Sequence, residues 1–450
     1  MKQNMSYEEI ESYLLEVPKF TKKNPLEETR GFYQYLLSEE SGMDMKETDL
    51  GKIIHIAGTN GKGSVCAYLN AIGRASGYRV GMFTSPHLID MRERFQIDGA
   101  LVSRESFVSA FYELEEMLEA YQRRKPSYQP TFFERMFFIM IFLFRKEKLD
   151  WLILETGLGG RLDTTNVIEH PTMTIITEIG YDHMAYLGNR IEDIAKEKAG
   201  IIKNGVPVVY VDRQEAVSVI IEQKAKEKNA PCFIVSKNEY KINEIQKKCI
   251  DFSVCSRYYD YIEMTLHSCA VYQIENAAIA VRAIDALKRF EQCNHITKDT
   301  MIQGIEQMYW PGRMDEVMPQ IFIDGAHNED GVDAFVESVK LLHEDGEEAA
   351  ILLFSAVNDK KYDKMIEKLC TLDCMKEYVV TRIPGNRGVK IEELKEQFEI
   401  FTNKPIRVFE EIKDAFTYCM QQKGDKDVMY IVGSLYLAGL VKELTENKTL

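Results

Sequence analysis

Short apolar runs alternate with helical stretches from about residue 53 to residue 288. Candidate strands lie at 80–84, 151–155, 172–177 and 206–211, and parts of them are continuously apolar, such as Ile153-Leu154. Strands buried on both faces have this pattern, which is typical of parallel sheets. The alternation therefore predicts a doubly wound, mostly parallel α/β domain, in which ligands bind at the carboxyl ends of the strands.

Three other stretches depart from this alternation. Residues 1–50 have the pattern of amphipathic helices interrupted by Pro18 and Pro25, whereas residues 136–144 are almost entirely apolar. That apolar run is too short to cross a membrane, so it predicts a buried helix. Between 238 and 266 apolar and polar residues alternate, which predicts two or three antiparallel strands at the domain edge, and a helical pattern returns at 273–290.

The strand and helix alternation restarts beyond a break at 297–312, where Trp310-Pro311-Gly312 cannot continue a helix. A helix is predicted at 330–343, and further helices lie between strands at 320–324, 349–356, 378–382, 406–409 and 428–432. We therefore expect a larger domain over residues 1–307 and a smaller, Rossmann-like α/β domain over residues 308–450. The smaller domain has no G-x-G-x-x-G motif, so no dinucleotide is assigned to it.

A glycine-rich segment, GTNGKGS at 58–64, lies between the apolar run 53–57 and a helical pattern at 65–75. Backbone N–H groups in such a turn bind anions, and the dipole of the following helix favours negative charge there. Lys62 adds a positive charge and Ser64 a hydroxyl, so the larger domain is predicted to be a P-loop ATPase domain. The spacing departs from the common G-x-x-x-x-G-K-[ST] pattern, which would need a hydroxyl at Gly63.

Polar residues follow three predicted strands at the edge where active sites of α/β proteins form. Ser85 follows the strand at 80–84, Glu155 ends the strand at 151–155, and His183 follows the strand at 172–177. Together they offer a hydroxyl, a carboxylate and an imidazole to one cation, although Mg²⁺ prefers oxygen ligands. The simpler alternatives are an ion pair at the end of the strand for Glu155 and a hydrogen-bonded structural role for His183.

Other charged groups also have two interpretations. Lys198 lies at the end of a helical run that begins near Ile191, and charged residues at such a position usually form a solvated face. Asp324 ends the first strand of the smaller domain, eleven residues after Arg313, and could cap the helix that follows. Alternatively, Arg313 and Asp324 could close over a nucleotide bound to the larger domain.

Composition limits the classes of function. The 450 residues carry a formal net charge of −15, which disfavours a nucleic-acid partner because its phosphates would be repelled. The nine cysteines include no C-x-x-C pair, and the N-terminal segment lacks the apolar core of a signal peptide. We therefore expect a cytoplasmic protein with reduced thiols, without a structural zinc site, a nucleic-acid partner or a membrane span.

Ten segments, in order, resemble those of folylpolyglutamate synthase and of bifunctional dihydrofolate synthase/folylpolyglutamate synthase, within the Mur ligase superfamily. They span roughly residues 50–440 and are HIAGTNGKGSV (55–65), GMFTSPHL (81–88), TFFE (131–134), LILETGLGGRLDTTN (152–166), GYDHMAYLG (180–188), EKAGIIK (197–203), QIENAAIAV (273–281), WPGRMDEV (310–317), FIDGAHNEDGV (322–332) and GSLYLAG (433–439). A phosphate loop alone is a weak signal, whereas ten ordered segments are a strong one.

The resemblance implies an ATP-dependent amide ligase that acts as a monomer on small molecules. In that family ATP phosphorylates a substrate carboxylate, and the amine of L-glutamate attacks the acyl phosphate to give an amide, ADP and phosphate. Phosphoryl transfer needs mainly positioning and neutralisation of charge, which Lys62 and Mg²⁺ can supply. Some members extend reduced folates and others also accept dihydropteroate, and both groups share every motif above.

The resemblance also implies roles for individual residues. Those implied for ATP are Asn60, Gly61, Lys62, Gly63, Ser64, Asn276, Arg313 and Asp324. Those implied for Mg²⁺ are Ser85, Glu155 and His183, with Lys198 matching a carbamylated lysine that can bind a second metal. Those implied for the pterin are Thr131, Phe132, Phe133, Leu162, Asp163 and Thr164, and those implied for glutamate are His327 and Ser434. The catalytic residues implied are Lys62, His183 and Lys198.

Small departures and two rival hypotheses accompany the resemblance. Tyr272 replaces a frequent histidine, Met184-Ala185 a Thr-Asp pair and Glu329 a proline, and none of these changes removes an implied ligand. A cell-wall Mur ligase would use the same chemistry but carries a nucleotide-sugar-binding domain before the phosphate loop, for which about fifty residues are too few. A nucleotide-binding switch without ligase activity would not need Arg313 and Asp324 on a second domain.

Overall fold

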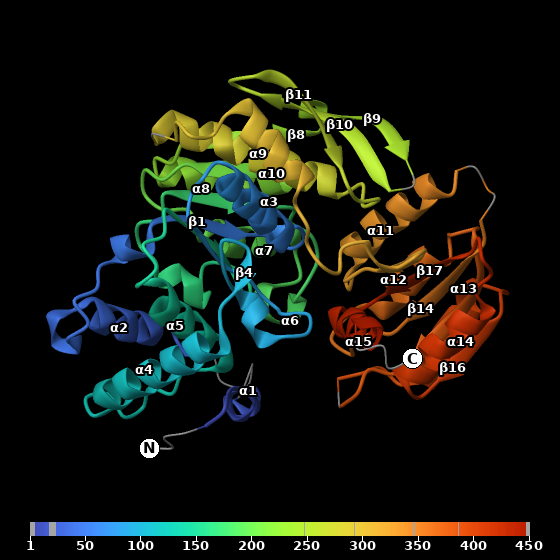
Figure 1. Ribbon diagram of the computed structural model, residues 1–450, viewed down its shortest axis with the longest axis horizontal. Coiled ribbons are helices and arrows are strands. Elements are labelled where there is room, and N and C mark those ends of the chain that lie inside the picture. Colours follow the sequence, from blue (N-terminus) through green and yellow to red (C-terminus); the bar gives the residue numbers. More distant parts are fainter. Residues whose placement is uncertain are drawn as a thin grey trace.

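The computed structural model describes residues 5–17, 24–246, 248–291, 293–344, 346, 348–385 and 387–446. Pro18, predicted to interrupt the N-terminal helices, lies outside these residues. Two α/β domains lie side by side, and a small antiparallel sheet above the larger domain extends toward the smaller one (Figure 1). No helix in these ranges is both long enough and apolar enough to span a membrane.

An eight-stranded sheet forms the centre of the larger domain, in the order β4-β3-β2-β5-β1-β6-β7-β8. Its parallel strands are β1 (Lys52–Ala57), β2 (Val80–Phe83), β5 (Trp151–Glu155), β6 (Met173–Ile176), β7 (Val208–Asp212) and β8 (Cys232–Ser236). An antiparallel hairpin of β3 (Phe95–Ile97) and β4 (Ala100–Leu101) forms one edge. The doubly wound, mostly parallel sheet is confirmed, but β3, β4 and β8 are absent from the predicted strands.

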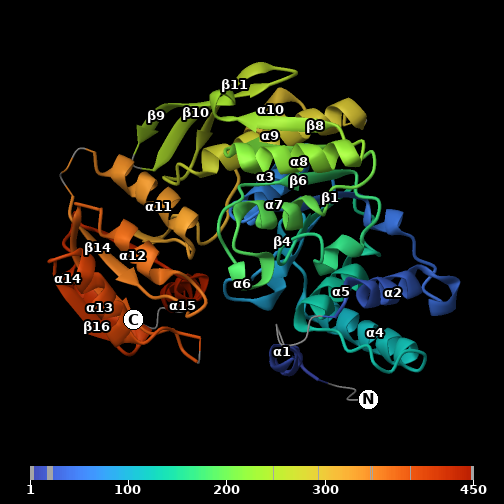
Figure 2. The same cartoon turned by 180° about the vertical axis from the view of Figure 1, so that it is seen from behind.

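Helices cover both faces of this sheet because alternate residues of each strand point to opposite sides. In β1, Ile54 and Ile56 belong to the core shared with α3 (Lys62–Ala75), α9 (Gln273–Phe290) and α10 (Lys298–Glu306). Two groups of helices cover the opposite face (Figure 2). The first group is α1 (Tyr7–Glu16), α2 (Leu26–Leu37), α4 (Arg104–Gln122) and α5 (Phe132–Phe144). The second group is α7 (Ile191–Ala199) and α8 (Glu215–Glu227). The apolar run at 136–144 lies in α5 and is buried, as predicted.

The predicted antiparallel strands are also present. They form a three-stranded sheet of β9 (Tyr240–Gln246), β10 (Cys249–Ser256) and β11 (Asp260–Leu266). Its apolar side chains, among them Phe252 and Ile262, join the core under α9 and α10. The sheet therefore extends the core of the larger domain on the side that meets the smaller domain.

The smaller domain has a six-stranded sheet in the order β12-β13-β17-β14-β15-β16, in which only β12 is antiparallel to its neighbour. The strands are β12 (Asp315–Met318), β13 (Ile321–Ile323), β14 (Ala350–Phe354), β15 (Met375–Thr381), β16 (Ile406–Phe409) and β17 (Val428–Val432). One face packs against α11 (Glu329–Leu342), α12 (Tyr362–Leu369) and α13 (Ile391–Phe401), and the other against α14 (Ile412–Gln422) and α15 (Leu435–Glu446). This arrangement confirms the second α/β domain, although β12 is absent from the predicted strands. The boundary between residues 307 and 308 stays a prediction, supported by the end of α10 at Glu306.

The phosphate loop follows β1, the strand at which the order of strands in the sheet changes direction. From β1 the chain passes to β2 and β5 on one side, and later to β6, β7 and β8 on the other. The crevice at such a point, outside the carboxyl ends of the strands, is where ligands of open α/β sheets bind. The predicted strand-end residues therefore lie along the same edge as the phosphate loop.

Candidate active site

The phosphate loop joins β1 to α3 in a conformation that requires glycine at two positions. Gly58 and Gly61 have φ angles of 156° and 83°. A Cβ atom on Gly58 would lie 1.8 Å from Thr177 Oγ1, and one on Gly61 would lie 2.3 Å from Asn276 Oδ1. Gly61 is the N-cap of α3, so this helix begins at Lys62, three residues before its predicted start. Asn276, predicted to contact ATP, thus lies directly against the loop.

A buried carboxylate and a lysine face each other beside this loop. Glu155, at the end of β5, accepts a hydrogen bond of 3.0 Å from the backbone N–H of Ser85, and Lys62 Nζ lies 3.9 Å from its Oε1. Burial raises the pKa of Glu155, and the positive charge of Lys62 opposes this shift. The hydroxyls of Ser64 and Thr156 are buried and have no hydrogen-bond partner within the described part of the chain. A carboxylate with nearby uncommitted hydroxyls is the oxygen-rich set that suits Mg²⁺ and phosphate.

No group of three or more His, Cys, Asp or Glu side chains in the described ranges is arranged to hold a metal ion. The possible metal ligands near the loop are instead of three chemical types, which are the carboxylate of Glu155, the hydroxyl of Ser85 and the imidazole of His183. Burial lowers the pKa of His183 to about 4, so its ring is neutral near neutral pH and a ring nitrogen lone pair is available. This donor set fits Mg²⁺, which usually keeps several water and phosphate ligands.

Lys198 is a buried residue of this site. It lies in the last turn of α7, is 4 % exposed, and its Nζ donates a hydrogen bond of 2.7 Å to the carbonyl oxygen of Gly58 in the phosphate loop. Burial, reinforced by the charge of Lys62, lowers the pKa of Lys198 to about 7. The solvated-face alternative for Lys198 is therefore wrong, because the side chain points into the protein.

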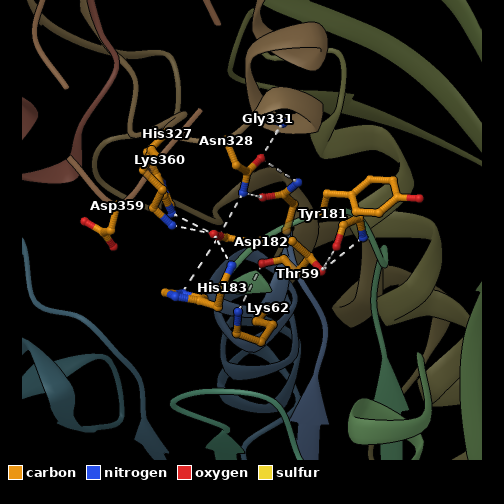
Figure 3. A network of polar contacts seen from close by, with 12 residues as sticks. Thr59, Lys62, Tyr181, Asp182, His183, His327, Asn328, Gly331, Asp359 and Lys360 are labelled. Carbon is orange, nitrogen blue, oxygen red and sulfur yellow. Dashed lines mark hydrogen bonds and ion pairs between the residues drawn. The ribbon is translucent and has the colours of Figure 1, made fainter. Parts of the chain in front are cut away.

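Asp182 connects the larger domain to the smaller one (Figure 3). Its carboxylate pairs with Lys360 Nζ, accepts a hydrogen bond of 3.2 Å from Asn328 Nδ2, and lies 3.7 Å from His327 Nε2. It also accepts the backbone N–H of His183 at 2.7 Å. Burial alone would raise the pKa of Asp182, but His327 and Lys360 hold it well below the usual range of a carboxyl group.

The phosphate loop takes part in the same connection between the domains. The side-chain amides of Asn60 and Asn328 exchange hydrogen bonds of 3.0 and 3.3 Å. The backbone N–H of Tyr181 donates to Asp330 at 3.1 Å, so the first turn of α11 of the smaller domain contacts the segment that follows β6. Asp182 and Asn328 lie in two of the family motifs, GYDHMAYLG (180–188) and FIDGAHNEDGV (322–332), but neither has a predicted role, and Lys360 lies in none of the ten motifs. Nothing in the local pattern around Lys360 distinguishes it from an ordinary loop residue.

Arg313 and Asp324 lie together where the smaller domain begins. Asp324 is buried and accepts hydrogen bonds from Tyr272 Oη at 2.6 Å, from Met314 N at 2.9 Å and from Ala326 N at 2.8 Å. The helix-cap alternative for Asp324 is wrong, because Asn328 is the N-cap of α11. Tyr272, which stands where many family members carry histidine, thus donates one of the three hydrogen bonds that this carboxylate accepts.

A cavity of about 210 Å³ lies beside Arg313, between the domain connection and the three-stranded sheet. Gln273 and Trp310 line it, and the Trp310 ring contacts Gly63 of the phosphate loop, where a Cβ would lie 3.0 Å from the indole. The cavity therefore adjoins the helix start of the predicted triphosphate site.

Several residues predicted to bind the acceptor or glutamate also have structural contacts. Thr131 caps α5 and Asp163 caps the turn Thr164–Val167, accepting the backbone N–H of Leu158 as well. Ser434 accepts the N–H of Tyr436. Phe132 and Thr164 are buried, Phe133 packs on Gly157, and Leu162 is exposed. Their roles toward substrates stay predictions.

The two α/β domains, with a phosphate loop where they meet, define a two-domain protein of the P-loop class. Residues 56–284 match the model of the Mur ligase middle domain, and residues 312–435 match that of the Mur ligase, glutamate ligase domain. The chain is 34% identical over 402 residues to the dihydrofolate synthase/folylpolyglutamate synthase of Bacillus subtilis, covering 87% of this chain and 90% of that protein. The chain therefore belongs to the folylpolyglutamate synthase family of Mur ligases.

Further relatives match over nearly the whole chain. The folylpolyglutamate synthase of Lacticaseibacillus casei is 28% identical, with 98% of both chains covered. Mycobacterium tuberculosis folylpolyglutamate synthase complexed with ADP has a TM-score of 0.84 at 25% identity, with 98% of each chain covered. E. coli FolC in complex with DHPP and ADP has a TM-score of 0.81 at 25% identity, with 99% of each chain covered.

The contact between Asp182 and Lys360 predicts energetic coupling across the domain interface. Because both side chains are buried, replacing either one leaves the other charge without its partner, and each of Asp182→Asn and Lys360→Met should destabilise the protein. The double variant should lose less than the sum, with a coupling energy of roughly 0.5–3 kcal/mol. Urea denaturation of the four proteins measures this coupling.

The exposed pair Lys364–Glu367 provides a matched control for this double-mutant cycle. Its cycle should show no measurable coupling, since exposed ion pairs contribute little. Strict additivity of the Asp182 and Lys360 substitutions would contradict the proposed link between the domains.

Proposed function

We propose that this protein is an ATP-dependent ligase that adds L-glutamate to a reduced folate, as a folylpolyglutamate synthase. The observation that carries the proposal is the meeting of two domains at one site. The phosphate loop of the larger domain touches Asn328, and Asp182 beside it touches His327 and Lys360 of the smaller domain. A ligase needs ATP, an acceptor and an amine together, and this junction brings separate binding elements to one place.

The residues of the larger domain would hold the triphosphate. Asn60, Gly61, Lys62, Gly63 and Ser64 would hold the phosphates through the start of α3, where N–H groups and helix dipole favour anions. Asn276, Arg313 and Asp324 would contact the rest of the nucleotide. Lys62, already beside Glu155, would neutralise charge that develops on the transferred phosphoryl group.

Ser85, Glu155 and His183 would hold Mg²⁺ at the same edge. When bound, the ion would neutralise phosphate charge during transfer. His183 suits this role because its ring stays neutral, and Glu155 because its carboxylate faces the phosphate loop. Lys198 would complete the set as a carbamate, which carries a negative charge and oxygen ligands in place of the ammonium.

The chemistry follows from what a carboxylate needs in order to react with an amine. A carboxylate is a poor acylating agent near neutral pH, so ATP first converts the acceptor carboxylate to an acyl phosphate, releasing ADP. The free amine of L-glutamate then attacks the acyl carbon, an amide bond forms and inorganic phosphate leaves. His327 and Ser434 of the smaller domain would position glutamate, while Thr131, Phe132, Phe133, Leu162, Asp163 and Thr164 would form the pterin side.

The family match supports a folate ligase over a cell-wall Mur ligase, since the relatives named above are folylpolyglutamate or dihydrofolate synthases matched along most of their length. The interdomain contacts of the phosphate loop argue against a nucleotide switch that works alone. We further propose that the enzyme acts as a cytoplasmic monomer on small molecules, with dihydropteroate as a second candidate acceptor. The bifunctional relative from Bacillus subtilis favours that candidate.

Release of phosphate from ATP should require both an acceptor and glutamate. Purified protein with ATP and Mg²⁺ is expected to release phosphate at a substantial rate only when L-glutamate and one acceptor are both present. The acceptor is either a reduced folate or dihydropteroate. A coupled phosphate assay measures this, and comparison of the two acceptors decides between them. Equal release with acceptor and glutamate omitted would exclude the ligase and favour a switch.

The buried position of Lys198 predicts that it becomes carbamylated. A carbamate forms only on a neutral amine, and with a pKa of about 7 that form predominates above about pH 7, so carbamate content should fall as the pH drops below that value. After equilibration with ¹³C-bicarbonate, ¹³C NMR should show a carbamate resonance that is absent from Lys198→Ala.

Activity should depend on this modification. Lys198→Ala should lose activity by about two orders of magnitude, comparable to loss of a metal-site partner. Short carboxylic acids should restore part of it. Lys196→Ala, which removes an exposed lysine from the same helix, is the control. Wild-type turnover by Lys198→Ala would remove this residue from the mechanism.

A further inference from the structure

Arg94 is a buried arginine that forms no ion pair with any residue that the structure describes. It ends the short turn Met91–Arg94 that leads into β3, and its side chain is almost fully enclosed, with the residue 6 % exposed. Within the described part of the chain its guanidinium forms one side-chain hydrogen bond, from Nε to Nδ1 of His87 at 2.9 Å, and no ion pair with any carboxylate.

Its neighbour in the same turn shows how arginine is normally accommodated. Arg92 Nη2 lies 2.7 Å from Asp90 Oδ2, so its charge is paired within the turn. Arginine is rarely buried unless paired, because an unpaired charge loses its hydration without compensation. Burial lowers the pKa of Arg94 to about 10, so the guanidinium is still charged at neutral pH. The fold therefore holds a buried positive charge whose side-chain hydrogen-bond partner, among the described residues, is Nδ1 of His87.

Arg94 lies close to residues from the predicted acceptor, metal and glutamate regions of the site. Its Cζ atom lies 5.4 Å from the ring centroid of Phe132, which belongs to the segment predicted to bind the pterin. Glu155, beside the phosphate loop, and Tyr436, two residues after Ser434 in the smaller domain, are near enough to act on its charge. Arg94 thus lies at the junction of the acceptor, metal and glutamate regions.

We propose that Arg94 binds a carboxylate of the acceptor's terminal glutamate and so positions the acceptor for phosphorylation. This inference rests on the proposed function, since it takes a folate as the acceptor. The reacting end of a folate must extend from the pterin region toward the phosphate loop, and it carries α- and γ-carboxylates. A guanidinium binds a carboxylate through two parallel N–H···O bonds, and Arg94 Nη1 and Nη2 are not committed to any carboxylate among the described residues.

His87 supports this role by fixing the guanidinium. Because its Nδ1 accepts from Arg94 Nε, the side of the guanidinium that carries Nε is occupied and the ring holds the group in one orientation. Phe132 lies against the guanidinium in a cation–π contact. These two contacts leave the terminal nitrogens for a ligand.

Binding of acceptor analogues to Arg94→Gln tests the proposal. Isothermal titration compares a reduced folate monoglutamate with its α-amide and its γ-amide, for the wild type, Arg94→Gln and Arg92→Gln. The wild type and Arg92→Gln should bind the diacid about 10- to 100-fold more tightly than one of the two amides, as expected for a charged hydrogen bond. In Arg94→Gln this difference should collapse to less than about threefold, while affinity for a non-hydrolysable ATP analogue stays within about twofold.

Retention of the wild-type preference for the diacid over both amides in Arg94→Gln would overturn the proposal. A loss of affinity for the ATP analogue with the acceptor preference intact would also overturn it, by assigning the guanidinium to phosphate. Arg94→Lys, which keeps the charge without the paired N–H groups, should bind the diacid with intermediate preference, and its melting curve separates misfolding from lost recognition. Failure of the wild type to bind any reduced folate would instead refute the proposed function.

Discussion

Burial of charged groups at the junction of the two domains is the constraint on which this site depends. Asp182 is enclosed by Lys360, His327 and Asn328, all from the smaller domain, and by the backbone of His183 from the larger one. A carboxylate removed from water must be compensated by partners. Here three of these four partners come from another domain, so the arrangement of the two domains and the charge state of the site are inseparable.

Burial and local partners also set the charge states of the other titratable groups in the site. Glu155 faces Lys62, whereas Lys198 donates a hydrogen bond to the carbonyl of Gly58, and burial lowers the pKa of this lysine. His183 is kept neutral by burial. These shifts produce a neutral imidazole and a lysine with an accessible neutral form, and the backbone N–H of Ser85 orients the Glu155 carboxylate beside the anion-binding loop. Together these groups suit phosphoryl transfer, in which positioned charges rather than covalent chemistry lower the barrier.

Much of this could be predicted from the sequence because the signals are local. The continuous apolar strands, the glycine-rich loop and the ordered motifs predict the doubly wound sheet, the second α/β domain and the loop with Asn276 against it. The short edge strands β3, β4 and β12 were missed because two to four residues carry no clear period. The charged-helix interpretation of Lys198 failed because burial depends on what packs over α7, which the helix sequence does not contain.

The long-range contacts could not be predicted for a related reason. Lys360 and Asn328 lie far along the chain from Asp182, and no periodicity connects them. Arg94 lies in a run of alternating charges, Arg92-Glu93-Arg94, which in sequence resembles an exposed turn. Only the packed structure shows that Arg92 pairs with Asp90, whereas Arg94 is enclosed with no carboxylate partner in the part of the chain that the structure describes.

Transfer of oxygen from the acceptor to phosphate tests the central claim most directly. A reduced folate labelled with ¹⁸O in its reacting carboxylate is incubated with ATP, Mg²⁺ and L-glutamate, and the released phosphate is analysed by mass spectrometry. Passage through an acyl phosphate moves one carboxylate oxygen into that phosphate, so the account predicts one ¹⁸O atom per phosphate formed with product. Phosphate that contains only unlabelled oxygen would contradict it.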